Sequence, residues 1–329
     1  MDDPRVDVHS LTRRSLGPLK PVKAAPTHLA PSMRPEDAFR ATLLDCLAQI
    51  TANTAAMRPS ESHKGRSVEA LHQLRVAFRR LDTALDAYRR EFGQDWLEEL
   101  RSRAKVLTAR LSPARDLDVF TEKLLVDAKW GVREGLPQLK ERAEAARDIA
   151  WAGVTRCIMD ADFERFTDDV AALASSSLPL SRDRHMSRAA ARMLDRQSRR
   201  VKKRGRQAKS GREGDLHRLR IGLKKLRYAC EFFAPLYSGK KVGRYLKALR
   251  GLQNDLGHLN DVANVRGVVH ALVKDAPRKQ AHKDDSAALS YAAGAMVGWY
   301  GAQVPSIART AMKRYRKFKK VKPFWVSRK

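Results

Sequence analysis

Apolar residues recur at helical spacing along almost the whole chain after Pro35. Spacings of three and four residues are typical of amphipathic helices, and no convincing run of alternating β-branched residues predicts a strand. The pattern therefore predicts an all-α fold. The expected helices are residues 35–57, 66–92, 94–111, 113–128, 137–159, 162–174, 184–207, 213–234, 240–256, 259–274, 283–302 and 304–320.

The expected helix ends follow from proline, glycine and capping residues. Ser112 followed by Pro113 is typical of a helix start. Gly257 can adopt the left-handed conformation that ends a helix. Leu178-Pro179, preceded by serines, marks the expected middle of the helical region.

Both ends of the chain differ from this helical region. Residues 1–34 contain many prolines and no helical period, which predicts a flexible basic arm. The helical domain is expected to cover residues 35–320, with halves 35–180 and 181–320. A basic tail, residues 321–329, follows it.

One helical motif occurs twice. LHQLRVAFRRL begins at Leu71, and LHRLRIGLKKL begins at Leu216, 145 residues later. The same offset, without a gap, pairs residues far beyond the motif. It therefore indicates an internal duplication and predicts two pseudo-symmetric four-helix bundles. The further pairs are Ala84 with Ala229, Tyr88 with Phe233, Lys105 with Arg250, Leu107 with Leu252, Leu111 with Leu256, and Asp116 with Asp261.

Each copy of the motif has an apolar stripe and a basic row beside it, at about 100° per residue. Basic residues also occupy the next position of each copy, Arg80 and Lys225. The apolar stripes are Leu71, Leu74, Phe78, Leu81, Leu85 and Tyr88, then Leu216, Leu219, Leu223, Leu226 and Phe233. The basic rows are His72, Arg75 and Arg79, then His217, Arg220, Lys224 and Arg227.

Two further basic segments lie in the second half. One continues as a helical ridge along residues 188–206, and the other is the acid-free C-terminal stretch from Lys313 to Lys329. The positive field is therefore expected to be stronger over the second half. The ridge consists of Arg188, Arg192, Arg196, Arg199, Lys203 and Arg206.

The overall charge agrees with these rows. Lys and Arg number 66 against 37 Asp and Glu, a formal net charge of +29. Like charges at i and i+4 destabilise a helix, and such a net charge repels itself in a compact state. One interpretation of each row is a solvated face with extended basic side chains. The duplication of the row in register favours a bound anion.

Other classes of protein are less well supported. Cys46, Cys157 and Cys230 are far apart and have no metal-ligand spacing, so we expect reduced, packed thiols and no metal. The N-terminus has no apolar segment typical of a secretory signal, which favours a cytoplasmic location. Residues Ser286 to Ala308 carry no charge but many small and polar residues, so a packed helix is favoured over a membrane span.

The combined motifs resemble the CHAD family, the conserved histidine α-helical domain. They are HxxRVxxRRL from His72, HxxRIxxKKLRY from His217, and LxxLQNDLGHLND from Leu249 to Asp261, and the resemblance extends over about residues 35–320. Membership implies two four-helix bundles, non-catalytic binding of inorganic polyphosphate and association with polyphosphate granules. The polyphosphate-binding residues that it implies by position are His72, Arg75, Arg79, Arg80, His217, Arg220, Lys224, Lys225 and Arg227, joined on charge and geometry by Arg196, Arg199 and Lys203.

The two copies are not identical. The first copy has Asp82-Thr83 where the second has Arg227-Tyr228, and Asn260 of the second replaces Arg115 of the first. The two halves are therefore not expected to bind equally. His72 and His217 have two open interpretations, contact with the ligand or a hydrogen bond that fixes one helix to its neighbour. Proximity to a polyanion would raise their pKa.

Catalysis is not expected. No second histidine or acid follows either histidine at i+3 or i+4, and no metalloprotease, phosphate-loop or nucleophile-elbow motif occurs. Residues from His217 to Gly222 loosely resemble a phosphotransfer motif, but the surrounding arginines and the duplication argue against that role. Asp116 and Asp261 are expected to act as caps or in salt bridges.

General nucleic-acid binding is the main alternative. Charge alone does not distinguish DNA or RNA from polyphosphate. Zinc-finger spacing is missing and few aromatic residues are interleaved with the basic rows, which argues against base recognition. The C-terminal aromatics could add weak nucleic-acid affinity, and an anionic membrane is a third candidate without insertion. These aromatics are Tyr315, Phe318, Phe324 and Trp325.

Overall fold

A computed structural model describes residues 20–59, 66–92, 96–126, 131–274 and 283–326. This part of the chain contains ten α-helices and no strand, which confirms the all-α prediction. The first half contains α1 (Pro35–Ala55), α2 (Val68–Phe92), α3 (Trp96–Arg110), α4 (Ser112–Val119), α5 (Leu136–Ile158) and α6 (Ala161–Ser175). The second half contains α7 (Met186–Gln207), α8 (Glu213–Phe233), α9 (Gly239–Lys274) and α10 (Lys283–Phe318).

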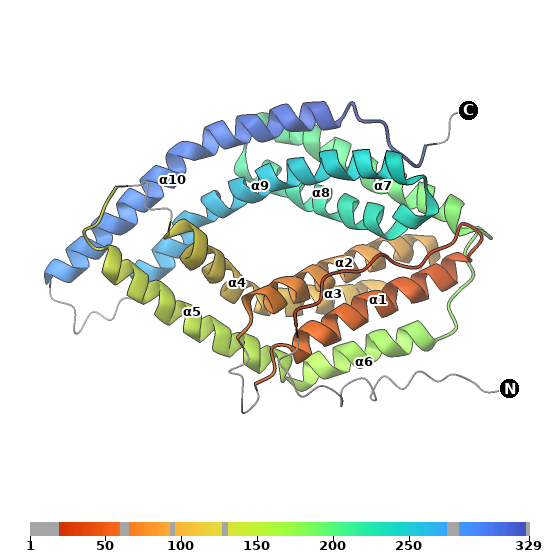
Figure 1. The fold of residues 1–329 in the computed structure, drawn as a ribbon, viewed down its shortest axis with the longest axis horizontal. Helices are drawn as coiled ribbons and strands as arrows, with labels where there is room; N and C mark the ends of the chain where they lie inside the picture. The colour runs from red at the N-terminus through yellow and green to blue at the C-terminus, as the bar shows by residue number, and fades with distance from the viewer. Residues whose placement is uncertain (1–19, 60–65, 93–95, 127–130, 275–282, 327–329) are drawn as a thin grey trace.

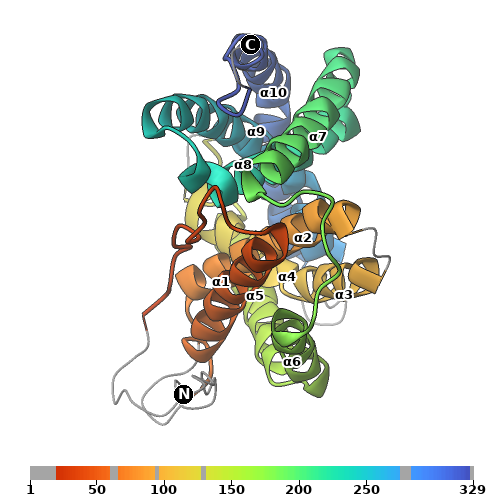
Figure 2. The same cartoon turned by 90° about the vertical axis from the view of Figure 1, so that its right-hand side faces the viewer.

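The helices form two groups that meet along α2 and α8 (Figures 1 and 2). In the first group α1 packs on α2 and α6, and α3 packs on the same two neighbours. In the second group α8 packs between α7 and α9, and α9 packs on α10. The expected boundary at Leu178-Pro179 lies in the non-helical segment between α6 and α7.

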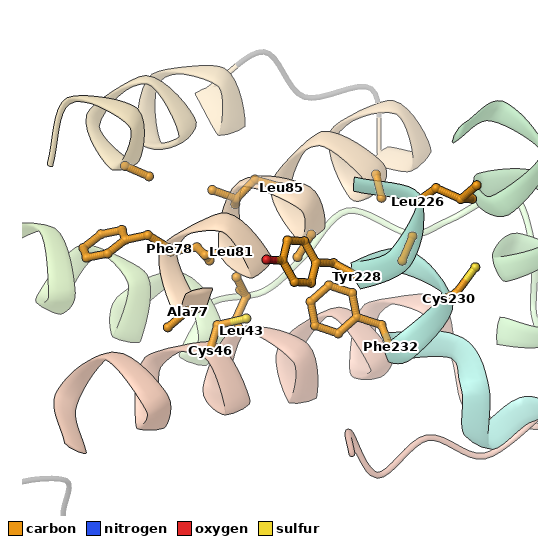
Figure 3. Packing of buried hydrophobic residues seen from close by; sticks show 14 of the residues in the cluster. Leu43, Cys46, Ala77, Phe78, Leu81, Leu85, Leu226, Tyr228, Cys230 and Phe232 are labelled. Carbon is orange, nitrogen blue, oxygen red and sulfur yellow. The ribbon is translucent and has the colours of Figure 1, made fainter. Parts of the chain in front are cut away.

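One large core extends through both groups. Both predicted apolar stripes are buried in it, as predicted. Side chains of α1, α2 and α8 meet in the part drawn in Figure 3. The ring of Tyr88 stacks on Phe39 with centroids 4.5 Å apart and meets the edge of Phe233 at 6.3 Å. Buried aromatic contacts of this kind fix α2 against α8 and thereby position the two basic rows relative to each other.

A second apolar cluster lies at the far ends of α9 and α10, where they pack with α5. The Tyr300 hydroxyl donates a hydrogen bond to the Leu124 carbonyl oxygen over 2.9 Å. Val304 and Ile307 of α10 pack against both clusters, so the long helices connect the two cores.

The predicted breaks in the last two helical regions are wrong. Gly257 lies inside the continuous helix α9 and does not have the left-handed conformation, which in the described residues occurs only at Gly131, Gly135 and Gly211. Pro305 likewise lies inside α10. Both helices bury an apolar stripe that continues past the expected break. Packing therefore outweighs the local preference of one glycine or proline.

The start of α4 also differs from the prediction. Ser112 is its first helical residue rather than its N-cap, and the Ser112 hydroxyl donates to the Thr108 carbonyl over 2.8 Å. Pro113 is in the first turn, as expected. The predicted helix 113–128 is α4 followed by a five-residue π-helix, Phe120–Leu124.

The terminal segments are bound to the helices where the structure describes them. Residues 20–34, expected to belong to a flexible arm, lie along α1 and α2 as a non-helical segment with a turn at residues 31–33. The Val22 backbone pairs with the Asn53 side chain in both directions, at 3.0 and 2.9 Å. Trp325 in the expected tail donates its indole N–H to Asp195 over 2.8 Å. The rest of both segments, 1–19 and 327–329, lies outside the described residues.

The uncharged segment Ser286 to Ala308 belongs to α10 and is partly packed against α5 and α9. No helix in the described ranges is both long and apolar enough to cross a membrane. Cys46, Cys157 and Cys230 are buried free thiols, and burial raises the pKa of Cys46 to about 12.

Candidate anion-binding site

The basic rows of α2 and α8 converge where the two helices lie side by side. Five cations form what we call the central basic cluster: Arg75 and Arg79 of α2, and Arg220, Lys224 and Arg227 of α8. The cations that act most strongly on Lys224 are the other four members of the cluster. The two copies of the motif therefore form one joint site across the boundary between the halves.

Asp116 and Asp261 face this cluster, and both were expected to act as helix caps or in salt bridges. Asp116 of α4 lies with Oδ1 3.6 Å from Nη1 of Arg75, which confirms that prediction for Asp116. Asp261 of α9 stabilises the charge of Arg220 electrostatically. Asp116 and Asp261 occupy equivalent positions of the repeat. A third carboxylate, Glu231, lies 3.7 Å from Nη1 of Arg227, so three carboxylates face five basic side chains and an excess of positive charge remains.

The cluster is recessed in the protein. Arg75 is only 6% exposed, and Arg220 and Lys224 are half-buried. The Nε atoms of Arg75, Arg220 and Arg227 are buried and have no hydrogen-bond partner within the described part of the chain. A buried donor without a partner costs about 1–3 kcal/mol. A phosphate group can accept several such N–H groups at once.

The cations of the central basic cluster repel one another, and burial together with this repulsion lowers the pKa values of Arg75, Arg220 and Lys224. Burial and the four neighbouring arginines lower the pKa of Lys224 to about 6. Burial and Arg79 lower the pKa of Arg75 to about 10, and the same two causes lower the pKa of Arg220. A bound anion would reverse these shifts because it stabilises every charged form. The protein thus holds cations in positions that are unfavourable without such an anion.

His217 contacts helix α9, whereas His72 is affected by the charge of Arg115 on α4. His217 Nδ1 lies 3.1 Å from Oδ1 of Asn260, and since an amide oxygen only accepts, His217 donates from Nδ1. Burial and nearby Arg115 lower the pKa of His72 to about 4. His72 is therefore neutral at neutral pH in the free protein. The hydrogen bond favours the structural interpretation for His217, and the lowered pKa argues against a charged ligand contact for His72.

Arg80 and Lys225 depart from the positions that the motif implies. Arg80 is 3% exposed, donates to Gln49 Oε1 over 2.9 Å, and lies over the Phe232 ring at 5.0 Å. It is a core residue, and its assignment to the polyphosphate site is corrected. Lys225 forms an ion pair with Asp82 over 2.7 Å and lines a pocket on another side of α8.

The predicted ridge on α7 is separate from the central cluster. Arg199 and Lys203 are exposed on α7, as a helical ridge requires. Arg196 is half-buried with Nη2 3.8 Å from Glu91, and burial is the main cause that lowers its pKa. The structure therefore places these three cations on a different surface from Arg79 and Lys224.

Sequence reasoning missed Arg115 of α4 as a neighbour of the site. It acts on both His72 and Arg75. The repeat offset contains the signal, because Arg115 is equivalent to Asn260, the partner of His217. Ser112 was likewise considered only as a helix cap, yet its Oγ accepts a hydrogen bond from Arg75 Nη2 over 3.2 Å.

The aromatics expected to add nucleic-acid affinity are buried. Tyr315, Phe318, Phe324 and Trp325 are each at most 7% exposed and pack with Tyr245. Burial removes the flat ring faces on which bases would stack. The prediction of a base-stacking tail is therefore wrong for these four residues.

Comparison with known proteins identifies the family. The profile of the CHAD domain matches residues 41–270. The crystal structure of the CHAD domain from the plant Ricinus communis is similar, with a TM-score of 0.74 and 24% identity, covering 89% of this chain and 96% of that chain. PptA from Streptomyces chartreusis has a TM-score of 0.65 and 18% identity, with 87% and 100% coverage. No curated protein matches the chain. The extent of the profile match shows that the chain belongs to the CHAD domain family.

Proposed function

We propose that this protein binds inorganic polyphosphate without transforming it, and that the central basic cluster is the main contact. The observation that carries the proposal is the convergence of five cations around Lys224, which exceed the three carboxylates that face them, Asp116, Asp261 and Glu231. Arginine can fork onto phosphate oxygens, whereas lysine contributes a point charge. A polymer of linked phosphates offers these groups at close, regular spacing without requiring any contact to a base.

In the same proposal, the central basic cluster binds its ligand without catalysing a reaction. His72, with a pKa of about 4, is a poor proton acceptor at neutral pH, and the Nδ1 of His217 is occupied by Asn260. No group of histidine, cysteine and acidic side chains that could hold a metal occurs among the described residues. We therefore assign the cluster to binding, and expect the protein to accumulate with polyphosphate granules in the cytoplasm.

We further propose that the domain consists of two duplicated four-helix units. Shifting α1, α2 and α3–α4 by the 145-residue offset brings them close to α7, α8 and α9. The same shift places α5 and α6 over the continuous helix α10. The third helix of the unit is thus broken into α3 and α4 in the first half and continuous as α9 in the second. The fourth is broken into α5 and α6 in the first half and continuous as α10 in the second. In this arrangement a long polymer contacts both copies of the motif at once and gains from effective concentration.

Nucleic acid is the competing ligand, and the exposed aromatics argue against it. Tyr291 and Trp299 are 59% and 41% exposed in the uncharged part of α10, and Trp96 is 44% exposed at the start of α3, so these three rings lie outside α2 and α8. Stacking on bases requires rings next to phosphate-binding cations. The cluster therefore offers phosphate contacts without a stacking surface.

A competition assay tests the choice between these ligands. Labelled long-chain polyphosphate is bound to the protein and displaced with duplex DNA at matched phosphate concentration. We expect polyphosphate to bind at least about tenfold more tightly at physiological salt, about 1.4 kcal/mol. If five cations are engaged, the slope of log affinity against log salt should be about −3 to −4. Equal competition by DNA would instead indicate a general polyanion binder.

Polyphosphate affinity is expected to fall as pH rises above about 6. In the free protein Lys224 loses its proton above that pH. The bound polymer raises its pKa, so binding takes up a proton, and affinity falls by up to about tenfold per pH unit. Below pH 6 Lys224 is charged in both states and adds no slope. Affinity measured from pH 5 to 9 checks this, together with calorimetric proton uptake in two buffers.

Lys224→Arg is the matched variant for the pH experiment. Arginine remains protonated over this range, so the variant should bind with a much flatter pH profile. An identical slope in both proteins would show that another group takes up the proton. A flat wild-type profile would show that Lys224 does not face the polymer.

A further inference from the structure

A basic pocket lies between α2, α3, α7 and α8, on a different side of α8 from the central basic cluster. We call it the α7 pocket, because α7 contributes the largest share of its lining. Its volume is about 620 Å³, within the range of small-molecule sites. Eight of the described lining residues are arginine or lysine, and Asp86 is the single acid among them.

The inner wall of the α7 pocket is a rigid, largely neutralised network. Asp86 is 3% exposed and accepts hydrogen bonds from Gln197 over 3.0 Å and from Arg200. Burial alone would raise the pKa of Asp86, but Lys225, Arg200 and Arg101 lower it to about 2. Asp86 is therefore ionised at every physiological pH, and it fixes the surrounding cations in place.

The rim of the pocket carries the excess positive charge. Arg90 and Lys203 are exposed at the rim on α2 and α7. Arg204 lies across α8 and donates to the Arg218 carbonyl oxygen over 3.2 Å. Gly222 leaves room for this side chain, since a Cβ there would lie 3.1 Å from Arg204 Cδ. Burial and the neighbours Arg200 and Arg218 lower the pKa of Arg204, as expected where cations crowd together.

The charge balance indicates the size of a suitable ligand. The eight lining cations are offset by Asp86, and by Asp82, Glu98 and Asp215, which form ion pairs with Lys225, Arg101 and Arg218. About four positive charges therefore remain around one small cavity. Because a phosphate ester carries about one and a half to two negative charges at neutral pH, a few clustered phosphates match this excess.

We propose that the α7 pocket is a second anion site, which binds a compact small molecule bearing three or more phosphate groups. The proposal goes beyond the binding of long-chain polyphosphate, because it concerns short, compact ligands and another surface. In the central basic cluster the cations lie along two neighbouring helices, which suits a linear chain. In the α7 pocket they converge from four helices around a cavity. The geometry thus assigns Lys203 and Lys225 to the pocket rather than to the linear site.

Calorimetry with inorganic tripolyphosphate as the probe tests this assignment. The pocket variant is Arg90→Glu with Lys203→Glu, chosen because both side chains are exposed and the fold should tolerate the change. The cluster variant is Arg220→Glu with Lys224→Glu. The control is Arg266→Glu with Lys274→Glu, two exposed cations on the far part of α9 with the same change in net charge. Circular dichroism and thermal unfolding verify that each variant is folded.

We expect the pocket variant to lose at least about tenfold in tripolyphosphate affinity, which corresponds to one lost charge-assisted contact or more. The cluster and control variants should lose less than about threefold, since only the long-range field changes for them. The proposal is overturned if wild-type protein does not bind tripolyphosphate, or if the pocket variant binds it as well as the control does. It is also overturned if the pocket variant weakens long-chain and short-chain binding equally, because both ligands would then share one continuous surface.

The same variants separate this proposal from the proposed function. If tripolyphosphate binding depends on Arg90 and Lys203 and the long polymer does not bind at all, the α7 pocket proposal is supported and the proposed function is wrong. If long-chain binding depends on Arg220 and Lys224 and tripolyphosphate does not bind at all, the proposed function is supported and the α7 pocket proposal is wrong.

Discussion

Replacing Arg220 and Lys224 together by glutamate is expected to lower the affinity for long-chain polyphosphate by about a hundredfold or more at physiological salt. Each residue loses a charge-assisted contact of about 1.5–3 kcal/mol, and each new carboxylate repels the polymer. The slope of log affinity against log salt should also become shallower by about 1.5, because two fewer counterions are released. Titration of labelled polyphosphate across a salt series measures both quantities.

The folded state should not suffer from this double substitution. Lys224 is held among four arginines, and its lowered pKa reports the repulsion that it experiences there. A glutamate at residue 224 would face Arg79 and Arg75 favourably, whereas a glutamate at residue 220 would lose the attraction of Asp261, so the free energy of unfolding should stay close to that of the wild type. A loss of binding together with retained or increased stability is the signature of a binding site, in which stability is exchanged for function.

The control for this experiment is Arg266→Glu with Lys274→Glu. It makes the same change in net charge at the far end of α9, away from the central basic cluster. Its affinity for polyphosphate should change by less than about threefold at physiological salt, where distant charges are screened. Equal losses in both variants would mean that total charge, not this cluster, determines binding.

The periodic features of α2 and α8 were predictable from sequence. An apolar stripe in a 3.6-residue period must be buried, and the basic row beside it must then lie at the edge of the core. For this reason the stripes, the all-α class and the proximity of Arg75, Arg79, Arg220 and Lys224 to an interior boundary followed from spacing alone. A duplicated motif in one register also favoured a joint site.

Local sequence patterns gave wrong predictions where contacts with another segment of the chain determine the conformation or the position of a side chain. Arg80 and Lys225 hold the same position in their motifs, yet Arg80 donates to Gln49 and to the Ala25 carbonyl, and Lys225 lines a pocket. Nothing within either motif encodes that difference, because the deciding atoms come from α1 and from the N-terminal segment. Gly257 illustrates the same limit, since helix α9 continues wherever tertiary packing supports its apolar stripe.

Gly135 is a position whose importance no local pattern indicates, and we expect Gly135→Ala to lower the free energy of unfolding by about 3 kcal/mol or more. Its φ of +72° strains any residue with a Cβ, at about 1–2 kcal/mol. An added Cβ would also collide with the backbone carbonyl of Ala288 on α10, and overpacking of this kind costs about 1–3 kcal/mol. Backbone atoms cannot rotate away, so α5 and α10 must separate.

The second apolar cluster makes this loss larger than local strain alone. Leu139, one turn beyond Gly135 on α5, packs there with Leu289 of α10, and separating the helices exposes both. Urea unfolding followed by circular dichroism measures the change. Polyphosphate binding by the fraction that remains folded should persist, because the central basic cluster lies in the other core.

Gly131→Ala is the matched control for this prediction. Gly131 has a φ of +75°, but no atom lies within 4 Å of the place where its Cβ would be. Gly131→Ala therefore introduces the conformational strain without the collision, and should lower the free energy of unfolding by only about 1–2 kcal/mol. If both substitutions lower the free energy of unfolding equally, the close approach of α5 to α10 contributes nothing to stability. A clearly larger loss at Gly135 would show that this contact holds the far ends of α9 and α10 to the first half, and thus stabilises the frame on which α2 and α8 present their cations.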